Sequence, residues 1–268
     1  MPKPKAGAEA GGAAARLTPQ QTIDRLVDAA ITLLAEKGPS EIKARSVAET
    51  AQVSTIAVYY HLGGLPELLQ AVADKGFRDL DSAFEAVAPS EDPVFDLFAM
   101  ALETRRLAQD NPHLYDLMFG LSTRGSYRPV QNSSAGAFSG RSEAFQAAYT
   151  HLVQACIRLV QSGRIRMDED PEIVATQLWS SVHGYVTLEL GEHFTQFKDP
   201  VRQVLQTMMV NLLVGLGDNA EVCNASHAAA ITAARAGARR PRKPKQAETK
   251  NAVPRKRVTK RAVVSRTD

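Results

Sequence analysis

The stretch from Ala44 to Leu69 constrains the fold of this chain more than any other part of the sequence. Its apolar residues recur at the spacing of two short helices that meet at a tight turn. These residues are Val47, Ala48, Ala51, Val53, Val58 and Leu62. Ser54 is expected to cap the second helix, because its hydroxyl can accept a hydrogen bond from the amide of Ile56 or Ala57. The spacing therefore predicts a helix-turn-helix whose second helix begins at Thr55.

The second of these helices has side chains that suit a nucleic acid. A helix of about seven residues is not stable alone, so some of its side chains pack inward and the others are exposed. The residues expected to be exposed are Thr55, Tyr59, Tyr60 and His61. Hydroxyl groups and aromatic rings fit the phosphates and base edges of DNA, so we predict that these residues bind DNA. The alternative is a helical corner of an ordinary all-α protein, in which the tyrosines are partly buried packing residues.

The same stretch resembles the N-terminal module of the TetR/AcrR family of bacterial transcriptional regulators. The matching residues are Val47-Ala48, Ala51, Val53-Ser54, the run from Val58 to Leu62, and Glu67-Leu68-Leu69. The resemblance implies that the module binds DNA, and it adds Arg45 and Ser54 to the predicted DNA-binding residues. Arg45 matches a position that often contacts DNA in this family. For Arg45 the alternative is a solvated surface arginine.

Two positions depart from the family pattern. Gln52 stands in the turn where the family usually has Gly, so Gln52 is expected to adopt a left-handed or strained conformation at some cost. Leu65-Pro66 stands where a Lys commonly reaches a phosphate, so that side-chain contact is lost. Pro66 suits the first turn of a helix, and the free backbone amides of that turn can still hold a phosphate.

The rest of the chain up to Leu216 has the pattern of amphipathic helices. Thr18, Pro19 and Gln21 predict a capping box at the start of the first helix, and Gly38-Pro39 ends it. The later helices are bounded by Pro, Gly, Asn or Asp. They are predicted at Pro66 to Pro89, Asp92 to Asp110, Pro112 to Gly120, Ser139 to Ser162, Pro171 to His193 and Pro200 to Leu216. No strand pattern is present, so the predicted fold class is all-α.

Four parts of the chain are predicted from these patterns. They are a disordered N-terminal arm (1–17), a helix-turn-helix domain (18–65), a helical ligand-binding and dimerisation domain (66–217) and a basic disordered tail (218–268). The Ala-rich start of the tail can continue as a helix through Ala234. From Arg235 to Asp268 there are 13 Lys or Arg and 2 acidic residues, whereas the body has a net charge near −8. The tail is interpreted as an arm for the DNA backbone, or else as a solubilising segment.

The predicted helices Pro171 to His193 and Pro200 to Leu216 each carry an apolar stripe that must be buried. An isolated subunit would leave a large apolar patch in water, and in the resembling family these two helices pair with their symmetry mates as a four-helix bundle. We therefore predict a homodimer. The predicted dimerisation residues are Val174, Leu178, Val182, Leu205, Met209, Leu212 and Leu216. The alternative is an internal helical hairpin in a monomer.

Trp179, His183 and Gly184, followed by Leu188-Glu189, resemble the type of TetR C-terminal domain that is named WHG after this pattern. Trp179 and His183 lie four residues apart on one helix face, so their rings can border a cavity. The predicted ligand-binding residues are Phe95, Phe98, Leu102, Met118, Phe119, Trp179 and His183. They predict a small hydrophobic effector with one polar contact at His183, and a gate in the loop 122–140. The alternative is a buried Trp beside a hydrogen-bonded core His.

Other functional classes have little support in the sequence. No run of 18 apolar residues exists, and residues 1–16 are too weakly apolar for a signal peptide, so we expect a cytoplasmic protein with no membrane partner. Cys156 and Cys223 have neither metal-binding nor disulfide spacing. One possible metal face is interpreted as a solvated helix end: Glu189, Glu192 and His193. We expect no catalytic activity, no cofactor and no metal.

Together these patterns predict a ligand-responsive regulator that binds a near-palindromic double-stranded DNA operator as a homodimer. A small hydrophobic molecule would release it from the operator, and repression is the usual sense in the resembling family. The main alternative is a DNA-architectural protein dominated by its basic tail, without an inducer. Binding that depends on salt but not on sequence would favour that alternative. A third reading is a helical enzyme with a metal site at Glu189 and His193.

Overall fold

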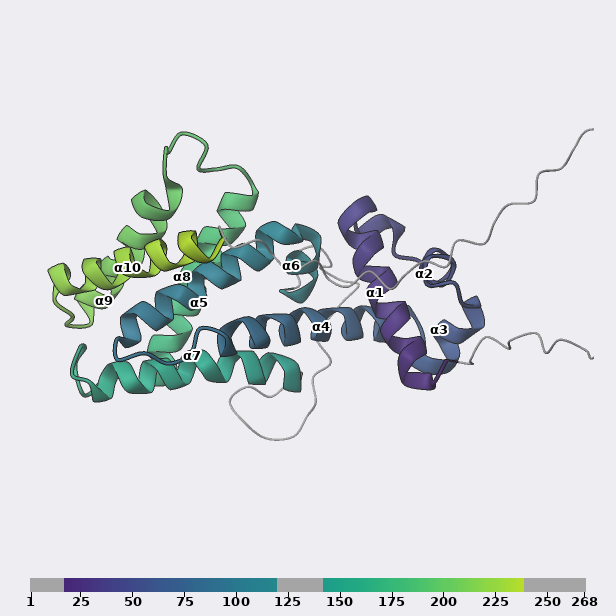
Figure 1. Ribbon diagram of the computed structural model, residues 1–268, viewed down its shortest axis with the longest axis horizontal. Coiled ribbons are helices and arrows are strands. Elements are labelled where there is room, and N and C mark those ends of the chain that lie inside the picture. Colours follow the sequence, from purple (N-terminus) through teal and green to yellow (C-terminus); the bar gives the residue numbers. More distant parts are fainter. Residues whose placement is uncertain (1–16, 120–141, 239–268) are drawn as a thin grey trace, which may run out of the picture.

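The computed structural model describes residues 17–119 and 142–238, and every regular element in these residues is helical (Figure 1). The predicted N-terminal arm up to residue 16, the candidate gate at 122–140 and residues 239–268 of the basic tail lie outside the described residues. The helices are α1 (Pro19–Lys37), α2 (Ala44–Ala51), α3 (Thr55–Leu62), α4 (Leu65–Glu85), α5 (Pro93–Asp110), α6 (Pro112–Met118), α7 (Glu143–Gln161), α8 (Pro171–Leu190), α9 (Thr207–Gly215) and α10 (Ala220–Ala238). A 3-10 turn, η1 (Pro39–Glu41), follows α1, and a π-helical segment, η2 (Val201–Gln206), leads into α9.

The N-terminal domain consists of α1, α2 and α3, and α2 and α3 form the predicted helix-turn-helix. Thr18 and Gln21 make the predicted capping box: Thr18 Oγ1 accepts from the Gln21 amide at 3.2 Å, and Gln21 Oε1 accepts from the Thr18 amide at 2.9 Å. Gln52 ends α2 at φ 56° and ψ 42°, the left-handed conformation that the turn requires. Val58 of α3 is fully buried, so this helix is fixed by one face and leaves the other in solvent.

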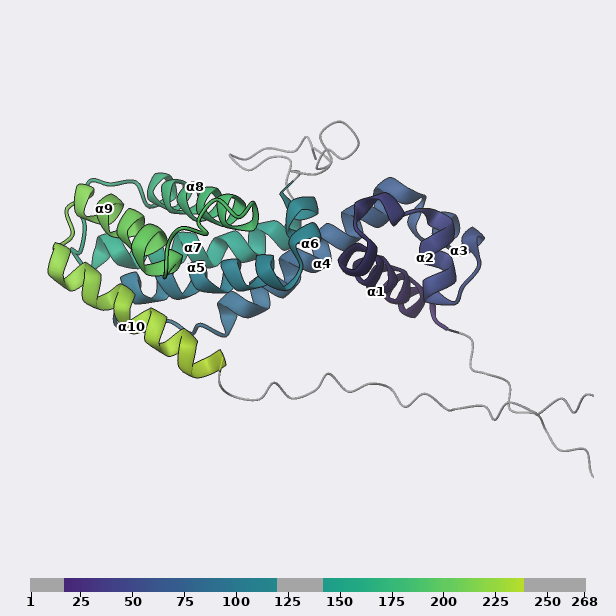
Figure 2. The same ribbon diagram turned by 90° about the horizontal axis from the view of Figure 1, so that it is seen from above.

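Helix α4 joins the two domains as one uninterrupted helix of 21 residues (Figures 1 and 2). At about 1.5 Å per residue it is about 31 Å long. Its first half packs against α1 and α3, where Leu68 is fully buried. Its far end packs against α5 and α7, and Phe84 there lies edge-on to His151 of α7. One rigid element therefore contacts both the helix-turn-helix and the core of the C-terminal domain.

Helix α5 is the central helix of the C-terminal domain. It contacts α4, α6, α7, α8 and α10, and none of its residues from Pro93 to Arg105 is exposed. In both views α10 lies along α5 on the side away from α7 (Figures 1 and 2). The two sides of α5 therefore have different neighbours, and this decides which of its side chains face a cavity.

Helix α10 extends the folded C-terminal domain beyond the predicted boundary at residue 217. Residues 220–238 are helical and pack on α5, so the folded part of the chain continues beyond residue 217. Cys223, His227 and Ile231 are buried at four-residue spacing and form the contact face. The composition of α10 concealed this role, because a helix built from Ala and a few larger residues can lie close to its neighbour without a wide apolar stripe.

Charged groups fasten the beginning of α10 to the rest of the domain. Arg164 donates from Nε and Nη2 to the two carboxylate oxygens of Asp218, each at 2.9 Å. It also donates from Nη1 to Asp92 Oδ1 at 3.1 Å, and Asp92 caps α5. The Asp218 side chain is only 1% exposed. This bidentate, charge-assisted pair ties the connections before α8 and before α10 to the start of α5.

Candidate nucleic-acid interface and apolar cavity

Three large apolar side chains of α3 face solvent. Ile56 is 76% exposed, Tyr59 59% and Tyr60 81%. These positions lie three and four residues apart, so the side chains are neighbours on one face of the helix. The helix-turn-helix therefore presents a joined apolar and aromatic surface to the outside.

The structure places most of the predicted DNA-binding residues on the surface. Thr55, Tyr59 and Tyr60 are exposed, and His61 is half-buried with its ring edge-on to Tyr60, 4.9 Å between centroids. The Arg45 side chain is 85% exposed, and its Nε lies 3.0 Å from Oε1 of Glu49. Exposed ion pairs of this kind contribute little to stability, so Arg45 can exchange Glu49 for a phosphate.

One detail of the prediction is wrong, and one residue was missed. Ser54 occupies the N-cap position of α3 but its side chain makes no capping hydrogen bond. Instead the Ala57 amide donates to the backbone carbonyl of Ser54 at 2.9 Å, so the exposed Ser54 hydroxyl is not used to hold the helix. Ile56 was considered only for its amide. Its spacing from Tyr59 was the signal that could have placed it on the exposed face.

An aromatic cluster forms where α6, α7 and α8 meet. Trp179 and His183 lie side by side on α8, with 4.2 Å between ring centroids. Phe119, directly after α6, lies 4.2 Å from His183 and 5.8 Å from Trp179. Phe145 and Tyr149 of α7 lie 5.8 Å and 5.5 Å from Trp179. Three of the predicted ligand-binding residues are thus brought together, and two aromatic residues of α7 join them.

A polar contact connects this cluster to α6. The hydroxyl of Tyr115 is hydrogen-bonded to Nδ1 of His183, and the two rings are stacked with their centroids 5.5 Å apart. Tyr115 is fully buried, and burial raises the pKa of its phenol well above the ordinary value, so the hydroxyl keeps its proton at neutral pH. Tyr115 and His183 therefore form a buried link between α6 and α8.

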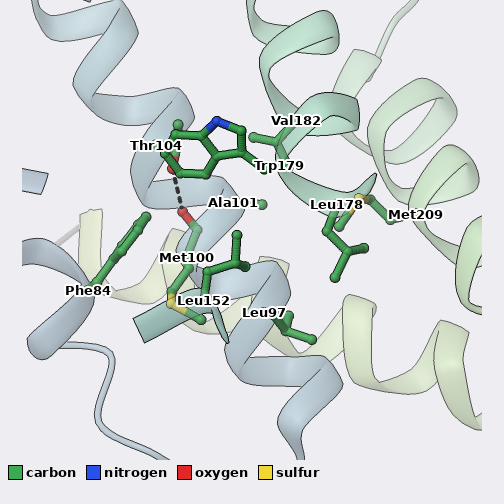
Figure 3. A pocket seen from close by; sticks show the side chains of 10 residues that line it. All are labelled: Phe84, Leu97, Met100, Ala101, Thr104, Leu152, Leu178, Trp179, Val182 and Met209. Atoms are coloured by element: carbon green, nitrogen blue, oxygen red, sulfur yellow. Dashed lines mark hydrogen bonds between the residues drawn. The ribbon is translucent and has the colours of Figure 1, made fainter. Parts of the chain in front are cut away.

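A small apolar cavity lies beside Trp179, between α4, α5, α7, α8 and α9 (Figure 3). Its volume is about 20 Å³, which holds about one water-sized sphere. Its lining residues are Phe84, Leu97, Met100, Ala101, Thr104, Leu152, Leu178, Trp179, Val182 and Met209. The hydroxyl of Thr104 donates to the carbonyl of Met100 at 3.0 Å, as drawn in Figure 3, so the lining offers no charge and no unused hydroxyl donor.

The face of α5 that lines this cavity is not the predicted one. Among the predicted ligand-binding residues, only Trp179 is part of the lining. Phe98 is fully buried, and its ring lies 4.3 Å from that of His227 on α10. Phe95 and Leu102 are half-buried and do not reach the cavity. None of these three residues of α5 lines this cavity, and α10 covers the side that carries Phe98, so their role in ligand binding stays a prediction.

The remaining predicted ligand-binding residues lie around α6. Phe119 and His183 belong to the aromatic cluster next to Trp179 rather than to the cavity lining. Met118 packs directly on α4, and a Cβ placed on Gly76 would lie 2.5 Å from the Met118 sulfur. Met118 therefore couples α6 to α4 and does not line this cavity, so its predicted role in ligand binding stays a prediction.

The residues predicted for dimerisation are mostly buried inside the subunit. Those that are at most 8% exposed are Val174, Leu178, Val182, Leu205, Met209 and Leu216, and Leu212 is half-buried. The prediction is wrong for the buried residues, because the apolar stripes of α8 and α9 pack within the domain. Helix α8 has a second face that stays exposed. Ile173 and Leu188 are 56% and 46% exposed there, and a Cβ placed on Gly184 would meet nothing within 4 Å.

Glu189, which was considered as part of a metal face, is held by hydrogen bonds within the C-terminal domain. Arg105 of α5 donates to both carboxylate oxygens of Glu189 at 2.7 Å and 2.9 Å, and the Tyr185 hydroxyl donates to the same carboxylate at 2.8 Å. Across residues 17–119 and 142–238, no three His, Cys, Asp or Glu side chains are grouped so that they could hold a metal ion. Burial raises the pKa of the Cys156 and Cys223 thiols to about 12, so both are protonated at neutral pH.

The helix-turn-helix, the connecting α4 and the helical bundle with its apolar cavity together define a two-domain, all-α architecture. Residues 97–212 match the family model described as "Tetracyclin repressor-like, C-terminal domain". This part of the chain is therefore similar to TetR-like C-terminal domains, and the chain shares its all-α fold with RolR. The predicted resemblance and the all-α fold class are confirmed at this level, while the WHG subtype stays a prediction.

Solved structures agree with this assignment of the fold. A protein of unknown function from Rhodococcus sp. RHA1 is 24% identical with a TM-score of 0.59, over 74% of this chain and 96% of that one. RolR in complex with resorcinol is 19% identical with a TM-score of 0.53, over 78% and 94%. FadR from Bacillus subtilis in complex with stearoyl-CoA is 16% identical with a TM-score of 0.53, over 72% and 96%. No curated protein sequence matches the chain significantly.

A helix that crosses a membrane needs about 20 predominantly apolar residues. None of the helices in the described parts of the chain is both long enough and apolar enough to cross a membrane.

Proposed function

We propose that this chain is a transcriptional regulator that binds a near-palindromic DNA operator as a homodimer and leaves it when a small hydrophobic molecule enters the cavity beside Trp179. The observation that carries this proposal is the double role of α4. This helix packs against α3 and also supplies Phe84 to the cavity wall. A molecule that displaces Phe84 therefore acts on the helix that supports the DNA-binding surface.

Helix α6 provides a second route between the same two sites. It contacts α1, and a Cβ placed on Gly38 at the end of α1 would lie 3.6 Å from Nε2 of His113 on α6. Two residues further along α6, Tyr115 is hydrogen-bonded to His183, next to Trp179. A movement of Trp179 can thus reach the N-terminal domain through packed side chains. The ligand changes DNA affinity only as far as it prefers one of the two conformations.

The cavity chemistry supports an uncharged, largely apolar effector. The lining consists of aliphatic, thioether and aromatic groups with Thr104 as its polar member. A volume of about 20 Å³ is too small for an organic ligand, so binding must push the walls apart. This requirement favours coupling between ligand binding and helix movement. The similar folds that hold resorcinol and stearoyl-CoA support an aromatic or acyl compound.

The exposed face of α8 is the proposed dimer surface in place of the buried stripe. Ile173, Gly184 and Leu188 lie on this face, and a glycine with open space above it lets a second helix approach closely. Two copies related by a two-fold axis would place two α3 helices on one DNA duplex, which is why a near-palindromic operator is expected.

Selection of bound DNA from a random library by the full chain tests this proposal. We expect one enriched motif with two related half-sites, and sedimentation at micromolar concentration should show a dimer. Hydrophobic compounds that raise the melting temperature should also weaken binding to the selected motif. Recovery of DNA without any motif, with affinity set by salt alone, would instead support the DNA-architectural alternative.

A further inference from the structure

The exposed surface of α3 lacks the side chains that usually read purines. From Thr55 to Leu62 the helix contains no Arg, Lys, Asn, Gln, Asp or Glu. Arg and Lys pair with guanine, and Asn and Gln with adenine, through hydrogen bonds to the major-groove edge. Within 55–62 direct base reading must therefore come from Thr55, from the tyrosines, from the half-buried His61 or from apolar contact.

Ile56 is placed to make the apolar contact. It is the second residue of α3 and 76% exposed, whereas Val58 two positions later is fully buried and holds the helix to its domain. Isolated exposed apolar residues are common on protein surfaces. Here, however, three of the nine exposed large apolar residues in the described parts of the chain share this one short helix: Ile56, Tyr59 and Tyr60.

We infer that Ile56 reads the 5-methyl group of thymine, and that each operator half-site contains a thymine at the position Ile56 reaches. The inference rests on the proposed function. Residues near the N-terminus of a recognition helix contact base edges in the major groove. The thymine methyl is the apolar group on those edges, so it is the matching partner for an exposed isoleucine. The tyrosine hydroxyls next to it can donate to phosphates, which positions the helix without reading sequence.

Replacement of thymine by 2′-deoxyuridine tests this contact, because it removes the methyl group and keeps every hydrogen-bonding group of the base. The full chain first selects its motif from a random library, and each thymine is then replaced at the symmetric positions of both half-sites. At one position we expect wild-type binding to weaken about fourfold per half-site, or about fifteenfold for the pair, from the burial of one methyl group.

The variant Ile56→Ala completes the comparison. It should bind the thymine motif more weakly than wild type, and at the critical position it should change less than twofold when thymine becomes uracil. Ile56→Val keeps a branched apolar side chain and should retain part of the discrimination. The matched control is Val222→Ala, which alters an exposed aliphatic residue on α10 and should respond to uracil as wild type does. Melting temperatures confirm that all four proteins are folded.

Two outcomes separate this inference from the proposed function. If a motif is selected but no thymine position responds to uracil, or if Ile56→Ala responds as strongly as wild type, the thymine contact is wrong while specific DNA binding stands. A motif without thymine in its half-site would also overturn it. If no motif is selected at all, the proposed function itself fails and the contact fails with it.

Discussion

Helices α3 and α9 are both short and rich in apolar residues. Most of the large apolar side chains of α3 face solvent, whereas Met209 and Leu213 of α9 are buried in the core. In α3 only Val58 is fully buried, and Ile56 and Tyr60 are mostly exposed. In α9 Met209 and Leu213 are each 1% exposed, and α8 and α10 pack around the helix. Apolar content alone therefore does not assign a helix to a core. An uncovered apolar face is a candidate for contact with another molecule.

The largest expected difference in stability is between two variants that each carry one new carboxylate, one in α9 and one in α3. Met209→Glu buries a carboxylate without a partner, and we expect the free energy of unfolding to fall by about 3 to 5 kcal/mol. Ile56→Glu puts the carboxylate in solvent, where the expected change is within about 0.5 kcal/mol. Urea denaturation of both variants measures the difference. Similar losses in the two proteins would mean that α3 is covered in solution.

A charge on the outer face of α8 is expected to separate the subunits without unfolding them. Leu188 is 46% exposed in the single chain, whereas Leu178 on the same helix is 1% exposed. Leu188→Glu should weaken the dimer by about 2 kcal/mol or more, since two carboxylates would be desolvated close together. Leu178→Glu should destabilise the fold instead. Sedimentation and melting curves distinguish the two results, and a Leu188→Glu protein that remains fully dimeric would rule out this dimer face.

Local signals in the sequence predicted the N-terminal domain well. The capping box at Thr18 and the left-handed Gln52 both depend on residues within one turn of each other, and both are present. The start of α3 at Thr55 follows from the same local pattern, although Ser54 caps it by its backbone position and not by its hydroxyl. Short-range geometry of this kind is fixed by the chain itself, so a sequence can reveal it.

The cavity depends on contacts between distant segments, and the sequence revealed less of it. Trp179 was identified because it shares a helix face with His183, a local relation. On α5 the cavity is lined by residues other than the predicted ones, and nothing near Phe98 in the sequence indicates that His227 covers it. Helix α10 lacks the wide apolar stripe that marked the other helices. The partner of each face of α5 is a tertiary choice, and periodicity alone cannot predict it.

Substitution of Tyr59 tests the exposed surface of α3, and its expected free-energy effect is smaller than that of the core substitutions. It is 59% exposed and neighbours Ile56 on α3. Tyr59→Ala should weaken operator binding by about 1 to 3 kcal/mol if the ring or hydroxyl contacts DNA. Tyr59→Phe separates the two contributions, because it removes only the hydroxyl. Fluorescence anisotropy with the selected operator measures both, and an unchanged affinity in a folded Tyr59→Ala protein would remove Tyr59 from the interface.

The smallest expected effect concerns His227, which packs α10 on α5. His227 is fully buried, its Nδ1 lies 2.7 Å from the carbonyl oxygen of Cys223, and its ring lies against Phe98. Burial is the main cause that lowers its pKa below the ordinary value of 6.5, so the folded protein holds it neutral. The unfolded chain takes up a proton below pH 6.5 and the folded protein does not. Stability should therefore fall as the pH falls from 6.5 toward the lowered pKa, by up to about 1.4 kcal/mol per pH unit.

Substitution of His227 isolates this contribution from that of other groups. Urea unfolding at pH 7.5, 6.5 and 5.5 should give His227→Leu a smaller loss of stability on acidification than wild type. The exposed His193 provides the matched control, and His193→Gln should keep the wild-type dependence. Well above pH 6.5 the wild-type contribution should be nearly constant, since His227 is then largely deprotonated in both states. Identical pH dependence in His227→Leu and wild type would show that α10 does not keep this imidazole buried. The packing of His227 against Phe98 of α5 would then be wrong.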